Sequence, residues 1–325
     1  MSATTATRSP DVPRPHEAPV RQGSRASSVS CVIVAFHRVD ALREVLRDLA
    51  HHSIETVVVN VEDDAEVAAV ADGHVVVAVE GNPGYAAAVN AGVAVATAPV
   101  VVFMNDDARI GAEDVLRLAS ALDDGWVDVV VPRAIDARGR REPTIAALPT
   151  PSSLLREWML LPDRRMRRIA RRLHVEKWRD PIGAERIDAA SAAVVATRRS
   201  LLTEVPLPEQ YFMYWEESEW FWRLHRRGAV VQVRPEVVCR HDGGRDDVRP
   251  AKSRLLARNA VRCVRRTQGR RAALAAWIVV VGWNTRLVIV DTARAVVRPS
   301  RPALARVRAR LAGLAAALTS VVELR

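Results

Sequence analysis

The chain has 325 residues, is 49% hydrophobic and carries a formal net charge of +10. This is enough apolar material for one large domain with a buried core. The basic excess suits nucleic acid, anionic lipid or a phosphorylated substrate, but no helix-turn-helix, zinc-finger or RNP-type motif accompanies it, which argues against nucleic acid. The three cysteines are odd in number and widely spaced, which argues against a disulfide framework or a Cys-based zinc site and favours a cytoplasmic location.

The first 27 residues are rich in Ser, Thr, Pro and Arg and contain no apolar run. We expect a disordered tail at 1–27, because such a segment cannot bury enough apolar surface to fold. Without an apolar h-region it does not have the pattern of a secretory signal.

Apolar strands and amphipathic helices alternate from residue 29 to residue 133. We expect strands at 29–36, 56–61, 74–80, 99–105 and 127–133, and helices at 39–50, 65–71, 84–97 and 112–122. Strands that are apolar throughout, alternating with helices, predict an α/β fold whose mostly parallel sheet is covered by helices on both faces. Ligands bind beyond the carboxyl ends of the strands in such sheets.

Three polar residues, Asn105, Asp106 and Asp107, stand at one of these carboxyl ends. Two adjacent carboxylates repel each other, and a divalent cation such as Mg²⁺ or Mn²⁺ would offset that repulsion. The alternative is a turn followed by a helix N-cap, since Asn and Asp serve both purposes.

Later segments carry two further candidates. Residues 211–228, "YFMYWEESEWFWRLHRRG", predict a helix with Glu216, Glu217 and Glu219 in its first turn, where the helix dipole favours ionised carboxylates. These acids are either helix-capping residues or include a general base held beside aromatic walls. His241 follows a strand-like segment and is either a surface residue or a metal ligand.

The C-terminal part of the chain contains both basic and apolar segments. Arginines crowd the segment 164–172 and recur every fourth residue from 254 to 266, at Arg254, Arg258, Arg262 and Arg266. Residues 272–290 are apolar, but Asn284 and Arg286 interrupt them, so we expect the segment to be too short and too broken to span a membrane. The pattern suits either a membrane surface or a solvated helix face packed beside a core helix.

The motifs "CVIVAF", "NPGYAAAVNAG", "MNDD", "IDAASAAVVATRRSLL", "YFMYWEESEWFWRLHRRG" and "VVCRH" occur in this order along the chain. Together they resemble the family 2 inverting glycosyltransferases of the GT-A fold, especially the bacterial rhamnosyl- and galactofuranosyltransferase branch. The resemblance covers roughly residues 28–265. It implies a GT-A domain at 28–250, followed by a helical extension at 251–325 that would associate with a membrane.

The resemblance also implies a site. The metal ligands for Mn²⁺ or Mg²⁺ would be Asp107 and His241, and the catalytic base would be Glu217. The residues expected to bind the nucleotide-sugar donor are Ala35, Phe36, Asn60, Asn82, Gly84, Asn90, Asn105 and Asp106. The residues expected on the acceptor side are Ser191, Ala192, Trp215, Glu216 and Arg258.

The implied reaction is a single displacement that inverts the anomeric carbon of a dTDP-rhamnose or UDP-sugar donor. The implied acceptor is a glycan or a polyprenyl-diphosphate-linked lipid at the inner face of the plasma membrane, with the arginines holding the protein there. Two positions depart from the family pattern, which has Asp at the positions of Asn60 and Glu217. The alternative is therefore a catalytically impaired relative that binds the membrane surface.

Two other enzyme classes fit the sequence less well. A dinucleotide-dependent oxidoreductase would carry G-x-G-x-x-G after its first strand. A sugar nucleotidyltransferase would carry a glycine-rich and basic loop there. This chain has "AFHRVD" instead.

Overall fold

The computed structural model describes residues 27–159, 181, 183–241 and 248–324, and every structural statement below concerns these residues. All but the last residue of the expected N-terminal tail lies outside them, as does the arginine cluster at 164–172.

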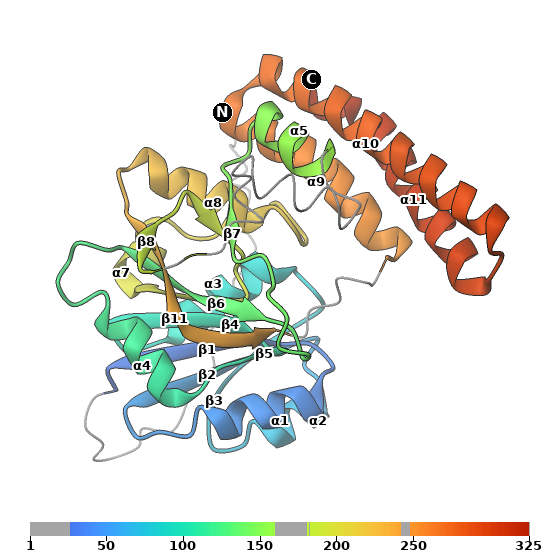
Figure 1. Cartoon of the computed structure of the whole chain (residues 1–325). Coiled ribbons are helices and arrows are strands. Elements are labelled where there is room, and N and C mark those ends of the chain that lie inside the picture. Colours follow the sequence, from blue (N-terminus) through green and yellow to red (C-terminus); the bar gives the residue numbers. More distant parts are fainter. Residues whose placement is uncertain (1–26, 160–180, 182, 242–247, 325) are drawn as a thin grey trace, which may run out of the picture.

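Nine strands of the described residues form one twisted sheet at the centre of the protein (Figure 1). Their order is β3–β2–β1–β4–β10–β6–β11–β5, with β8 paired to β11. The strands are β1 (Val29–Ala35), β2 (Ile54–Val61), β3 (Val75–Val79), β4 (Val100–Asn105), β5 (Ala108–Arg109), β6 (Val129–Ile135), β8 (Glu185–Arg186), β10 (Val194–Arg198) and β11 (Val231–His241). A separate pair joins β7 (Ile145–Ala146) to β9 (Ala189–Ala190).

Helices cover both faces of this sheet, as the alternating pattern predicts. They are α1 (Val39–Asp48), α2 (Ala65–Val70), α3 (Tyr85–Val95), α4 (Ala112–Ser120), α7 (Arg199–Glu204) and α8 (Glu216–Arg226). Buried side chains of α1, α2 and α4 form one apolar cluster with the sheet. Those of α3, α7 and α8 form a second cluster on the other face. Two-sided burial explains why the strand sequences are apolar throughout.

The sheet departs from a purely parallel one at β10. This strand runs antiparallel to both of its neighbours, β4 and β6. The motif "IDAASAAVVATRRSLL" contains two separate strands, β9 and β10. Ser191, between them, donates its N–H to the carbonyl of Thr144 at 2.8 Å.

The C-terminal helices and α5 form a helical bundle beside the sheet (Figure 1). It comprises α5 (Pro151–Met159), α9 (Pro250–Gln268), α10 (Arg270–Val297), α11 (Arg301–Thr319) and the short 3-10 helix η2 (Ser320–Leu324). Half of the eight buried residues in their common core are alanines, namely Ala257, Ala260, Ala276 and Ala317. Small side chains let the helix axes approach closely.

Helix α10 has 28 residues and is the one described helix long and apolar enough to cross a membrane, by length and composition alone. The expectation that residues 272–290 are too short for this was wrong, because the helix continues at both ends to Arg270 and Val297. Asn284 does not interrupt it, since its side chain donates to the carbonyl of Val280 at 2.8 Å.

Gly92 tests how tightly α3 packs on the sheet. A Cβ at Gly92 would lie 2.3 Å from Val32 Cγ1 and 2.8 Å from Val59 Cγ2, whereas one at Gly282 in α10 would meet nothing within 4 Å. Both changes to Ala gain the same helix propensity. We expect Gly92→Ala to lower the free energy of unfolding by about 1–3 kcal/mol relative to Gly282→Ala, through overpacking. Urea unfolding of the two variants measures the difference; equal values would contradict the close approach.

Candidate active site

The two adjacent aspartates close the turn between β4 and β5. Asp106 is buried, and its Oδ2 accepts a hydrogen bond from the Phe36 N–H at 3.0 Å. Burial raises the pKa of Asp106 to about 6, and this hydrogen bond partly opposes the rise. Asp106 therefore ties the end of β4 to the end of β1, its parallel neighbour.

The pairing of β5 with β11 brings His241 to Asp107. The register sets His241 opposite Ala108 in an antiparallel pair. His241 Nε2 consequently lies 3.4 Å from Asp107 Oδ1 and 3.5 Å from Asn105 Nδ2. Residues more than 130 positions apart in the sequence thus meet at the carboxyl edge of the sheet.

Opposite charges stabilise this pair on both sides. Arg38 Nη1 lies 2.5 Å from Asp107 Oδ2, and His241 Nδ1 lies 3.1 Å from Glu142 Oε2. Burial alone would raise the pKa of Asp107, but the hydrogen bonds and charges of His241 and Arg38 hold it below its usual value. Burial likewise opposes protonation of His241, but Asp107 and Glu142 raise its pKa to about 9.

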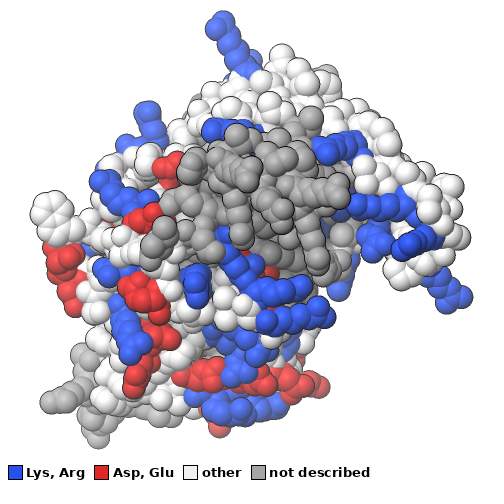
Figure 2. All heavy atoms as spheres, viewed as in Figure 1, with Lys and Arg blue, Asp and Glu red and all other residues white. Residues whose placement is uncertain are grey.

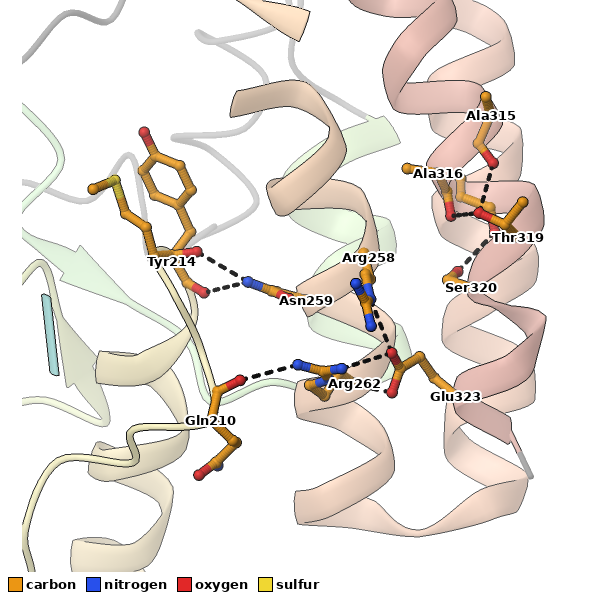
Figure 3. A network of polar contacts seen from close by, with 12 residues as sticks. Gln210, Tyr214, Arg258, Asn259, Arg262, Ala315, Ala316, Thr319, Ser320 and Glu323 are labelled. Atoms are coloured by element: carbon orange, nitrogen blue, oxygen red, sulfur yellow. Dashed lines mark hydrogen bonds and ion pairs between the residues drawn. The ribbon is translucent and has the colours of Figure 1, made fainter. Parts of the chain in front are cut away.

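Glu217 is held at the start of α8 by a strained turn. Tyr214 and Trp215, just before this helix, have φ values of +70° and +79°. Non-glycine residues adopt this left-handed region at a cost, and such residues cluster at functional sites. Helix α9 supports the turn: Asn259 Nδ2 donates to the carbonyls of Met213 at 2.9 Å and Tyr214 at 3.2 Å (Figure 3).

The neighbouring carboxyl of Glu216 has a different environment. It is buried, and its Oε2 has no hydrogen-bond partner among the described residues. Burial raises the pKa of Glu216, and the charge of Glu217 adds to the rise. Glu216 does not line the cavity that Glu217 faces, so its expected place on the acceptor side is not what the structure shows.

Two cavities meet at the Asp107–His241 pair. The first, of about 590 Å³, is lined by His241, Glu217, Ser191 and Trp215. The second, of about 520 Å³, is lined by Asp106 and Asp107 together with residues of α1. The pair therefore stands between the cavities, with Asp107 bordering one and His241 bordering the other.

The loop before α3 is fixed against the segment that precedes α8. The side chain of Asn82 accepts from the Gly84 N–H at 3.1 Å. Gly84 has φ +93°, and an added Cβ would lie 2.2 Å from the carbonyl oxygen of Phe212. Only glycine fits this close approach of the two backbone segments. Asn90 donates to the Leu207 carbonyl at 2.9 Å and accepts from the Leu207 N–H at 3.1 Å.

Asn60 and Arg258 use their side chains for contacts within the fold, and Asn60 lies beside Ala35 in the register of β1 and β2. Asn60 is buried, and both ends of its amide bond the backbone of Asp64, at 2.9 and 3.0 Å, so it closes the turn before α2. Arg258 bonds Glu323 at 3.0 Å and does not line the cavity with Glu217. At the end of β1, Ala35 is buried and Phe36 is exposed. The carbonyl of Ala192 accepts a hydrogen bond from Tyr85 Oη at 3.1 Å.

Three residues of the site were missed from the sequence. Arg38 and Glu142 contact Asp107 and His241 as described above. Tyr85 lies near the acidic residues of the turn after β4 and of α8: burial raises its pKa, and the charges of Glu216 and Glu217 add to the rise. Only Tyr85 had a sequence signal, its place in the "NPGYAAAVNAG" motif.

Comparison with known proteins gives a family match for part of the chain. Residues 30–176 match the family described as Glycosyl transferase family 2. Uncharacterized glycosyltransferases of Mycobacterium bovis and Mycobacterium tuberculosis are 34% identical over 124 residues, which is 38% of this chain and 56% of each relative. The chain thus spans little more than half the length of the curated relatives it matches.

Solved structures support the architecture over a longer stretch. A mannosyltransferase from Pyrobaculum calidifontis in complex with GDP-Man and Mn²⁺ aligns with a TM-score of 0.51 at 14% identity, over 91% of this chain and 88% of that one. GalNAc-T7 with UDP, GalNAc and Mn²⁺ aligns with the same TM-score and identity, over 74% of this chain and 48% of that one. The fold is of the GT-A type. The family match covers residues 30–176, which is less than half of the 325-residue chain, and the comparisons do not distinguish a branch of that family.

Helix α8 is also fixed to α9 by a buried carboxylate. Glu219, two residues after Glu217, accepts from Tyr211 Oη at 2.6 Å and Arg266 Nε at 2.8 Å, and it pairs with Arg223 at 2.5 Å. Burial alone would raise the pKa of Glu219, but the hydrogen bonds from Arg266 and Tyr211 and the charge of Arg223 outweigh it and lower the pKa.

This network predicts a pH-dependent stability. A lowered folded-state pKa stabilises the protein above the unfolded pKa, and that contribution is lost as the pH falls through the folded value. We expect Glu219→Gln to lower the free energy of unfolding by about 1–3 kcal/mol at pH 7. The difference from wild type should shrink below about pH 4. Urea unfolding at both pH values measures it. A loss of equal size at both would show that packing, not the charge, carries the contribution.

Proposed function

We propose that this protein transfers a sugar from a nucleoside-diphosphate sugar to an acceptor hydroxyl, inverting the anomeric carbon. The observation that carries this proposal is the position of the Asp107–His241 pair between two cavities, one of which Glu217 lines. A donor on one side and an acceptor on the other would meet at that pair. The donor sugar that we put first is rhamnose from dTDP-rhamnose, followed by a UDP-linked sugar.

The donor set at this junction suits Mn²⁺ or Mg²⁺. No cluster of three or more His, Cys, Asp or Glu in the described part of the chain could hold a metal by itself. Such cations commonly take one or two protein ligands and complete their shell with substrate phosphates. Asp107 and His241 would supply the protein ligands. When bound, the cation would supply positive charge to the departing diphosphate.

The protein's own groups complete the reaction. Glu217 would accept the proton of the acceptor hydroxyl as that oxygen attacks the anomeric carbon, so no enzyme nucleophile is needed. Arg38 lies beside Asp107 on the side of the second cavity and would add positive charge near the diphosphate. The strained Tyr214–Trp215 turn holds Glu217 in place before the substrate arrives.

The first cavity supports an acceptor larger than a free sugar. Beyond Glu217 and Ser191 it extends to apolar side chains of the C-terminal bundle, including Leu256, Trp283 and Leu287, and to Arg310. An apolar wall of this kind suits an acceptor with an apolar portion. Within this proposal the acceptor is a lipid-linked cell-envelope glycan, and the protein works peripherally at the inner face of the plasma membrane.

Removing the proposed metal carboxylate tests the donor half of the proposal. We expect Asp107→Asn to abolish Mn²⁺-dependent hydrolysis of the preferred nucleotide sugar in a panel of dTDP-, UDP- and GDP-sugars. Asp72→Asn is the matched control, because Asp72 is exposed beyond α2. Nucleotide-sugar hydrolysis by Asp107→Asn at the wild-type rate would refute the assignment. The absence of nucleotide binding in the wild type would favour the alternative of a catalytically impaired membrane-binding relative.

Replacing the proposed base tests the other half. We expect Glu217→Gln to retain donor binding, since Glu217 lines the other cavity, and to reduce donor turnover by about 10²–10⁴-fold. Glu216→Gln is the comparison: Glu216 is buried and does not line the cavity that Glu217 lines, so the loss should be far smaller. Titration calorimetry of donor binding and a product-release assay separate the two effects. The reverse ranking would make Glu216 the base.

A further inference from the structure

The outer side of α10 carries an apolar stripe that nothing in the described chain covers. Leu274, Ile278, Ile289 and Val296 are all exposed, Ile278 and Ile289 by 60% and 63%. They are four, eleven and seven residues apart, which are whole numbers of helical turns, so they share one face. Gly282 and Thr285, on the same face, are exposed and uncharged.

Helix α11 and η2 repeat this arrangement. Leu304, Leu311 and Leu318 are exposed and seven residues apart, and Val321 and Val322 in η2 are exposed as well. In all, ten of the sixteen exposed large hydrophobic residues of the described chain lie between Leu274 and Val322. Apolar surface gathered in this way marks an interaction site rather than ordinary surface composition.

The charge around these stripes has one sign. Residues 270–325 contain ten Arg and only two acidic residues, Asp291 and Glu323. Asp291 is buried and pairs with Arg310 at 3.0 Å, and Glu323 pairs with Arg262 at 2.9 Å. Figure 2 shows Lys and Arg, and no Asp or Glu, over the α10–α11 hairpin on the face in view. The surface left for a partner is therefore apolar and cationic.

We propose that the outer stripes of α10 and α11 dock onto an anionic lipid bilayer, with the helices lying along its surface. A basic helix with an exposed apolar face binds such a surface by burying its apolar side chains and by electrostatic attraction to the anionic lipids. This inference names the surface for the membrane association within the proposed function and rests on that part of it. It does not rest on the sugar-transfer chemistry.

Two other arrangements fit the structure less well. Crossing the bilayer would require α10 to leave the bundle, because its opposite face buries Asn284 and Asp291 against the other helices. Docking of a second copy would bring exposed arginines such as Arg271, Arg306 and Arg308 together, with no free acidic side chain in the hairpin to pair them.

The docking surface also differs from the one that the sequence suggested. Of the arginines on α9, Arg258 and Arg262 bond Glu323 (Figure 3). Arg266 bonds Glu219. These three hold the bundle to itself and to α8, and are engaged before any lipid is present. The exposed arginines of α10 and α11 take the role that was expected of them.

Vesicle co-sedimentation of the full chain tests the proposal, with phosphatidylcholine vesicles that contain or lack phosphatidylglycerol. We expect binding that requires the anionic lipid and is released by an alkaline carbonate wash. The double variant Ile278→Glu/Ile289→Glu should bind at least about tenfold more weakly. Trp126→Glu is the matched control, since Trp126 is 80% exposed on the catalytic domain and should bind as wild type does.

Three results would overturn the proposal. The first is equal binding by the double variant and wild type, or no binding by wild type. The second is binding that survives the carbonate wash, which would mean that α10 crosses the bilayer. The third is a concentration-dependent dimer in sedimentation velocity that the double variant abolishes, which would assign the stripe to a second copy. Donor hydrolysis measured without vesicles on the same samples reports separately on the sugar-transfer chemistry and on folding.

Discussion

The two-residue strand β5 determines where the chemistry can occur. Its antiparallel pairing with β11 sets His241 opposite Ala108 and so places the imidazole against Asp107. Asp107 in turn lies on a turn that Asp106 anchors to the end of β1. One backbone register therefore joins the β1–β4 part of the sheet to the part that contains β11. A slip of one residue would point His241 to the opposite face, and the two cavities would no longer share a border.

The C-terminal helices belong to this site as much as the sheet does. Asn259 and Leu256 of α9 accept or donate the hydrogen bonds that hold the turn before Glu217. Arg266 reaches the buried carboxylate of Glu219 on α8. A turn with two residues in the left-handed region is strained, and its own sequence does not offset that strain. The hydrogen bonds from α9 stabilise the turn instead. The expected division at residue 250 separates segments of different composition, but the contacts run across it.

The sequence was informative where structure is local. Apolar runs and helical spacing predicted every strand and helix from β1 to β4 within a few residues, because each element's own sequence shows how it is buried. Pairings between distant segments left no such trace. The strand β5 is too short to have a pattern, and Glu142 contacts His241 only after the chain has folded. The regular spacing of arginines on α9 was visible, but Glu219 and Glu323, which engage them, lie elsewhere in the sequence.

Helix α10 joins the two functions proposed for the protein. Trp283 and Leu287 face the cavity that also holds Glu217, while Ile278 and Ile289 are exposed on the opposite side. A single helix thus separates the candidate acceptor site from the candidate membrane surface. An acceptor anchored in the bilayer would have to travel only around this helix. The membrane contact and the acceptor cavity would then follow from the two sides of one helix.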